Sequence, residues 1–94
     1  MKRIRKKLPW MWLSFAENGF RGVVILRARD IIEAVAITTR LGINPGGQAL
    51  AIVQPPSFTP PQKAVLRLLS RVDINELMPE MDAISIKEWE AWKK

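Results

Sequence analysis

The residue types with the clearest binding chemistry in this sequence are tryptophan and arginine, which gather near its N-terminus. Trp10, Trp12, Arg21 and Arg27 are the four we single out as candidate ligand-binding residues. An indole ring stacks on a nucleobase with about 1–3 kcal/mol, and a guanidinium group binds phosphate through several N–H donors. Tryptophan and arginine are also enriched where proteins bind each other. The set therefore predicts an anion-binding surface or a protein-contact surface, with burial inside the chain's own core as the structural alternative.

A second basic set follows in the other half of the chain. Lys63, Arg67 and Arg71 are spaced four residues apart, so on a helix they would project from one face. Together with the basic N-terminus they would form a continuous anion-binding field. The alternative is an ordinary solvated helix face.

A glycine-rich loop, Gly42-Ile43-Asn44-Pro45-Gly46-Gly47, supplies three further candidates, Asn44, Gly46 and Gly47. Phosphate-binding loops follow a strand and open a helix, whose N-terminal amides attract the anion. Here the loop follows an expected helix and leads into an expected strand. The order favours a tight Pro-Gly turn, with a ligand-contacting loop as the alternative.

The sequence contains no cysteine, histidine or tyrosine. Thiol and imidazole nucleophiles, disulfides and the usual zinc and haem ligands are therefore excluded. Several of the acidic residues fall in helix-capping patterns, and none forms an acid-base pair or a metal-ligand spacing. We expect a protein that is not an enzyme and that needs neither a cofactor nor a metal.

The length and the charge set further bounds. The 94 residues are 48% apolar and carry a formal net charge of +6, which indicates one folded domain over 1–94. Residues 1–29 hold eight basic and one acidic side chain, whereas 73–94 hold three basic and six acidic ones. We expect a basic arm over 1–9 and a cytoplasmic location without membrane contact. We also expect a homo-oligomer, since a chain this short gains burial by associating.

The pair Asn18-Gly19 between two apolar runs predicts a β-hairpin with a two-residue turn. Its strands would cover about 11–17 and 20–28, and Trp10 would face Arg27 across them. One face would carry apolar residues that a helix can cover, namely Met11, Leu13, Phe15, Phe20, Val24 and Leu26. The opposite face would carry the tryptophans and arginines.

The remaining pattern completes an α+β fold. Capping signals predict a helix over 31–41, and the apolar run 48–54 predicts an interior strand. A Pro-rich connector over 55–61 leads into a helix that ends near Val72, and 73–94 form an acidic segment with a terminal helix from Ile86. We therefore predict a small antiparallel three-stranded sheet packed with two or three helices, in the order ββαβα(α).

Two short motifs carry a resemblance. The strand Trp12-Leu13-Ser14-Phe15-Ala16 and the loop Leu41-Gly42-Ile43-Asn44-Pro45-Gly46-Gly47 resemble those of short uncharacterised bacterial and bacteriophage proteins, over the first half of the chain. The resemblance implies a small phage-type accessory or defence-countering protein, a class that works by binding.

These observations lead to two functional hypotheses. The first is a binding protein that holds an anionic partner, a nucleotide signal or nucleic acid, on its basic and tryptophan-bearing surface. The second is an inhibitor of a host protein, or an oligomeric adaptor, that uses the same surface for protein contact.

Overall fold

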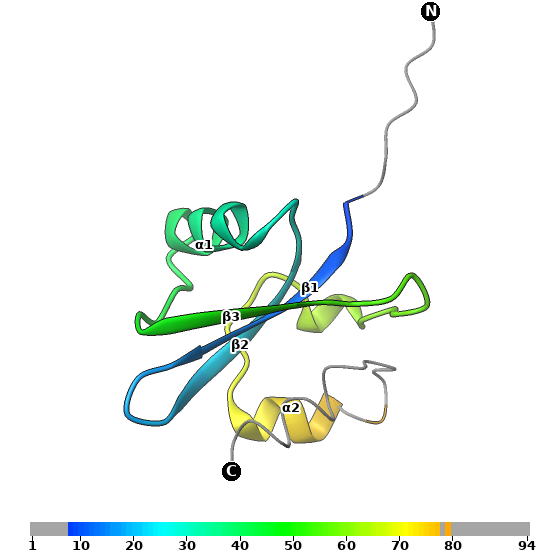
Figure 1. Cartoon of the computed structure of the whole chain (residues 1–94). Helices are drawn as coiled ribbons and strands as arrows, with labels where there is room; N and C mark the ends of the chain where they lie inside the picture. Colours follow the sequence, from blue (N-terminus) through cyan, green and yellow to red (C-terminus); the bar gives the residue numbers. More distant parts are fainter. Residues whose placement is uncertain (1–7, 78, 80–94) are drawn as a thin grey trace, which may run out of the picture.

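The computed structural model describes residues 8–77 and 79, and these form a three-stranded antiparallel sheet covered on both faces (Figure 1). The predicted α+β class and element order are confirmed. The basic residues before Leu8 and the expected terminal helix lie outside the described residues. The elements are β1 (Trp10–Ala16), β2 (Phe20–Arg27), α1 (Ile31–Arg40), β3 (Gln48–Val53), the 3-10 turn η1 (Gln62–Ala64) and α2 (Arg71–Leu77).

The hairpin between β1 and β2 has the predicted register over most of its length, from Trp10 opposite Arg27 to Phe15 opposite Gly22. The two-residue turn is wrong, because Ala16 pairs with Phe20 and the strand alternation shifts there by one residue. The shift is a β-bulge, and it moves Phe20 from the predicted helix-covered face to the opposite one. There Phe20 packs against a cluster of buried residues: Trp12, Val23, Ile25, Phe58, Ala64, Leu69, Ile74 and Leu77.

Helix α1 covers one face of the sheet. It begins at Asp30, whose carboxylate accepts a hydrogen bond of 2.8 Å from the Glu33 amide, and it ends one residue before the predicted Leu41. Five of the six residues predicted for this face lie in one buried cluster, which also contains Ala28 and, from the helix itself, Ala34: Met11, Leu13, Phe15, Val24 and Leu26.

The opposite face is covered by the second half of the chain, and here the predicted helix ending near Val72 is wrong. Between Pro55 and Ser70 only η1 is helical, and the chain then runs along the outer edge of β2, with bridges from Val65 to Ile25 and from Leu69 to Val23. Val23 and Leu69 exchange two backbone hydrogen bonds of 3.0 and 2.7 Å. Pairing with the outer edge of β2 therefore determines the conformation of this segment, although its local sequence pattern favours a helix.

Helix α2 begins directly after Ser70. The Ser70 amide donates to the Asp73 carboxylate at 2.9 Å, and the Asp73 amide donates to the Ser70 hydroxyl at 3.1 Å. The Ser-x-x-Asp spacing is a capping box, and it fixes the point at which α2 leaves the sheet edge. Figure 1 shows α2 and α1 on opposite sides of the sheet.

Strand β3 is an edge strand, which corrects the prediction of an interior one. The central strand is β1, because β3 pairs with β1 on the side away from β2. Its apolar side chains are consequently only half covered, and Leu50 and Val53 are 43% and 55% exposed.

Two capping carboxylates make the stability depend on pH. The backbone amide of Arg29 lowers the pKa of Glu33, and the backbone amide of Ser70 lowers the pKa of Asp73. A pKa that is lower in the folded chain stabilises the fold above the ordinary carboxyl pKa, and this stability is lost as the pH falls through the lowered value.

We expect Asp73→Asn and Glu33→Gln to lower the melting temperature at pH 7. Their difference from the unsubstituted chain should shrink as the pH falls from about 5 through the lowered pKa values. Thermal melts between pH 7 and pH 2 measure this. A difference of constant size over that range would show that the carboxylate charges do not stabilise the caps.

No helix within 8–77 and at 79 is both long and apolar enough to cross a membrane.

Candidate ligand-binding site

The candidate site lies at the end of the sheet where β1 begins and β2 ends. Arg27 and Trp10 are direct cross-strand partners. On the other side of Trp10, the Gln54 amide donates a hydrogen bond of 2.9 Å to the Trp10 carbonyl oxygen. One residue from each of three adjacent chain segments therefore forms a row across the sheet: Arg27, Trp10 and Gln54.

Arg27 and Trp10 form a cation-π pair. The guanidinium carbon of Arg27 lies 4.2 Å from the centroid of the indole ring. The same guanidinium donates a hydrogen bond to the Leu8 carbonyl oxygen. On the core side, Phe58 meets Trp10 edge to face, with ring centroids 6.4 Å apart. These contacts hold the guanidinium in one place while leaving it further N–H donors.

A cavity of about 370 Å³ opens beside this pair. Pockets of roughly 300–1,000 Å³ hold small molecules in other proteins. Three of its wall residues are prolines, which restrict the backbone around it. The lining consists of Leu8, Pro9, Trp10, Arg27, Gln54, Pro55 and Pro56.

Gln54 adds a buried polar group to the lining. The residue is 4% exposed, and its amide nitrogen donates to the Ile52 carbonyl oxygen at 3.4 Å. Its side-chain oxygen is buried and accepts no hydrogen bond from the residues that the structure describes. A buried acceptor without a donor costs about 1–3 kcal/mol. A ligand in the cavity that donates a hydrogen bond to the side-chain oxygen of Gln54 would remove this cost.

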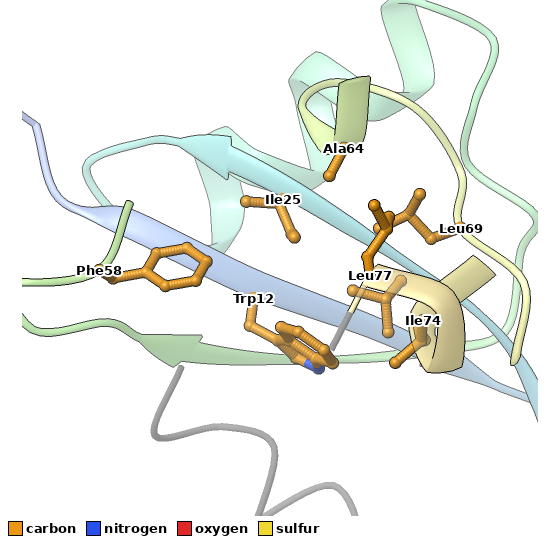
Figure 2. Close-up of a cluster of buried hydrophobic side chains, with 8 residues drawn as sticks. Trp12, Ile25, Phe58, Ala64, Leu69, Ile74 and Leu77 are labelled. Atoms are coloured by element: carbon orange, nitrogen blue, oxygen red, sulfur yellow. The ribbon is translucent and has the colours of Figure 1, made fainter. Parts of the chain in front are cut away.

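Of the four tryptophan and arginine candidates, the structure brings Trp10 and Arg27 together. Trp12 lies on the same face of the sheet but is fully buried, so the prediction that it contacts a ligand is wrong. Its indole packs beneath Ile25, between Phe58 and the residues of α2 (Figure 2).

Arg21 lies at the opposite end of the hairpin. Its guanidinium pairs with Glu17 at 3.5 Å and donates to the Pro45 carbonyl oxygen at 3.2 Å. Arg21 therefore connects the hairpin turn to the glycine-rich loop and is not part of the cavity.

The second basic set does not form one helix face, because the helix that would align it is absent. Arg67 pairs with Asp73 at 3.2 Å, and the Arg71 guanidinium lies 5.5 Å from the centre of the Phe20 ring. Lys63 and Arg67 line a smaller cavity of about 190 Å³ together with Asp73, Glu76 and Leu77. The two acids offset the basic charge there, so this region is not a continuous anion-binding field.

The glycine-rich loop forms internal contacts. The Asn44 side-chain oxygen accepts a hydrogen bond of 2.7 Å from the Gly46 amide, and its nitrogen lies 3.3 Å from both Thr38 and Thr39 hydroxyls. Gly47 approaches the backbone of Ala16 closely. These contacts favour the structural interpretation of Asn44, Gly46 and Gly47 as a turn.

Gln54 and the flanking prolines were not predicted from the sequence to belong to a site. A signal was present, because Gln54 ends the predicted third strand and directly precedes Pro55 and Pro56. Placing it beside Trp10 required the register between β1 and β3, which no local pattern specifies. Among residues 8–77 and 79, no group of acidic side chains could hold a metal ion.

Comparison of the chain with models of protein families, with curated proteins and with solved structures gave no match.

Proposed function

We propose that this chain is a non-enzymatic binding protein that holds a nucleotide in the cavity beside Trp10 and Arg27. The guanidinium of Arg27 would bind the phosphate, while the indole of Trp10 and the proline rings would contact the base. The observation that carries the proposal is a guanidinium carbon 4.2 Å from the centroid of an indole ring, with both side chains lining a cavity of about 370 Å³.

The fixed position of Arg27 supports binding of an anion. A side chain that is already ordered loses less conformational entropy when a ligand binds. The indole and the Leu8 carbonyl order this guanidinium before any ligand arrives. Charge-assisted hydrogen bonds from arginine to phosphate are about twice as strong as neutral ones.

The neighbouring sequence adds positive charge. Leu8 lines the cavity, and the residues just before it include five basic side chains: Lys2, Arg3, Arg5, Lys6 and Lys7. These basic residues directly precede Leu8 in the sequence. Positive charge on a protein raises the local concentration of an anionic ligand.

Two sources of nucleotide fit this chemistry, a free nucleotide signal and one nucleotide of a single-stranded nucleic acid. A free nucleotide would bind with a modest dependence on salt, because few phosphates are neutralised. A longer strand would engage the basic N-terminal residues as well, and its affinity would fall steeply with salt. In the phage-type setting that the sequence motifs imply, sequestering a nucleotide signal would counter a defence without any chemistry.

The test compares Arg27→Gln with Arg40→Gln. Both changes remove one positive charge, but Arg40 is exposed on α1 and does not line the cavity. We expect Arg27→Gln to weaken binding of a mononucleotide about tenfold or more, because a hydrogen bond to a charged group contributes about 1.5–3 kcal/mol. Arg40→Gln should bind like the unsubstituted chain. Isothermal titration with a panel of mononucleotides and a short single-stranded oligonucleotide measures both affinities.

Equal weakening by the two variants would show that only net charge matters, and absence of binding by the unsubstituted chain would refute the proposal. Recovering the nucleotide chemically unchanged after denaturing the protein would support binding without catalysis. Conversion of the nucleotide during incubation would contradict it.

A role in protein contact is the second candidate function. The observation that favours it is the exposed apolar edge of β3, which carries Leu50 and Val53.

A further inference from the structure

The two edges of the sheet differ in how they are covered. The outer edge of β2 is paired with the segment that carries Val65 and Leu69. Within residues 8–77 and at 79, no strand or bridge pairs with the outer edge of β3. In Figure 1, β3 crosses in front of the other two strands. Unpaired edge strands bind further strands unless charge, proline or a bulge prevents it.

The backbone groups that β3 offers can be assigned from the register. The Gln54 amide bonds to Trp10, and in an antiparallel ladder the bonded pairs alternate along the strand. Ala49, Ala51 and Val53 therefore direct their amides and carbonyls away from β1. These three residues form a regular set of donors and acceptors along the outer edge.

The edge lacks the features that usually prevent strand addition. The segment from Gln48 to Gln54 contains no charged residue, no proline and no glycine. Its side chains on both faces of the sheet are partly exposed, with Leu50 at 43% and Val53 at 55%. Strand addition here would cover apolar surface in addition to pairing backbone groups.

The residue pattern of this segment identifies its partner. Gln48-Ala49-Leu50-Ala51-Ile52-Val53-Gln54 has nearly the same chemistry in both directions. An antiparallel pair of two such strands centred on Ala51 would place Gln48 opposite Gln54, Leu50 opposite Ile52, and Ala49 opposite Val53. A two-fold symmetric interface requires a surface that is complementary to itself, and this strand provides one.

We propose that two copies of this chain pair through β3, antiparallel and centred on Ala51, to form a continuous six-stranded sheet. Each of the three bonded pairs (Ala49 with Val53, Ala51 with Ala51, and Val53 with Ala49) exchanges two backbone hydrogen bonds. The side chains of Val53 and Leu50 lie on opposite faces of the sheet. Ala49 of the second copy would cover Val53, and Ile52 of the second copy would cover Leu50. The pairing involves neither Trp10 nor Arg27. Gln54, which lines the cavity, is only the last residue of the paired segment, and its backbone amide bonds to Trp10 and not to the second copy.

Salt separates the dimer from ligand binding. Each copy carries a formal net charge of +6, so two copies repel each other. Screening this repulsion strengthens the dimer as salt rises, because its contacts are apolar and backbone ones. Binding of an anionic ligand weakens under the same change. The two properties are thus expected to respond to salt in opposite directions.

The experiment compares Val53→Lys with Val72→Lys in the full chain. The two valines are 55% and 64% exposed, but Val72 lies on α2, away from the edge. Val53→Lys places a charge within the paired edge, which interrupts strand addition. We expect the unsubstituted chain and Val72→Lys to sediment as dimers at micromolar concentration, and Val53→Lys to sediment as a monomer.

A second variant addresses the backbone directly. Ala51→Pro removes an outward-facing amide without removing a bond to β1, so an edge strand tolerates it. We expect a folded monomer, with folding verified by circular dichroism. A monomeric unsubstituted chain at high salt, or a dimer that persists in Val53→Lys, would overturn the proposal. Loss of dimer with retained nucleotide affinity would separate this inference from the proposed function.

Discussion

Replacing Trp12 by alanine is expected to lower the free energy of unfolding by about 3–5 kcal/mol, the range for truncating a large buried aromatic side chain. Trp12 is fully buried at the centre of the cluster that joins the sheet to the second half of the chain. It shares this cluster with residues that are far apart in sequence, such as Phe58 and Ile74 (Figure 2). A cavity there would weaken the attachment of 55–77 to the sheet as a unit.

Two matched variants separate packing from polarity and from binding. Trp12→Phe keeps an aromatic ring and removes the buried indole N–H, which donates no hydrogen bond within the described part of the chain. Since an unpaired buried donor is unfavourable, this change should cost less than Trp12→Ala. Trp10→Ala should also cost less, because Trp10 is only partly buried, yet it should abolish nucleotide binding.

Urea titrations followed by circular dichroism measure all three stabilities on one scale. The expected order of stability loss places Trp12→Ala first. A Trp12→Ala chain as stable as the Trp10→Ala chain would show that the cluster around Trp12 is not the main connection between the two halves.

The first half of the fold follows from local patterns. Alternating apolar residues around Asn18-Gly19 fix which residues of β1 and β2 face each other, and Asp30 and Gly42 bound the first helix. The pairing of Trp10 with Arg27 could therefore be predicted from the sequence, and it supplies the core of the candidate site. The bulge was missed because it depends on how the turn closes and not on the strand pattern.

The second half depends on contacts that are distant in sequence. The capping pattern from Thr59 to Gln62 and the four-residue spacing of the basic residues both indicate a helix, and either signal is sound locally. The edge of β2 instead binds the segment around Leu69 through backbone hydrogen bonds. Leu66 even adopts a positive φ of 55° there, a conformation that the local sequence disfavours. Tertiary pairing therefore overrides local preference, and the predicted basic face disappears with the helix.

The site itself divides in the same way. Arg27 and Trp10 belong to one hairpin, so their proximity is a local property. Gln54, Pro55 and Pro56 lie beside this pair only because β3, which follows α1 in the chain, pairs with β1. That return depends on the glycine-rich loop, whose role is to place Gln48 opposite Ala16.

Gly47→Ala tests this role of the loop and is expected to be among the most destabilising single substitutions in the chain. A Cβ atom at Gly47 would lie 2.6 Å from the Ala16 carbonyl oxygen, a contact with backbone that cannot move without disturbing β1. Gly47 also has a φ of 87°, where an L-residue costs about 1–2 kcal/mol. The steric contact adds about 1–3 kcal/mol by comparison with overpacked cores.

Gly46→Ala is the matched control, because Gly46 has a φ of 85° but a methyl group added there would have no atom within 4 Å. It shares the conformational cost and lacks the steric one. Urea titrations should therefore give Gly47→Ala a free energy of unfolding that is about 1–3 kcal/mol lower than that of Gly46→Ala. Because β3 carries the outer edge and leads directly into Gln54, partial displacement of this strand in Gly47→Ala should weaken nucleotide binding and dimer formation together. Equal stability of the two variants would mean that the loop can move away from Ala16 without cost to the strand it positions.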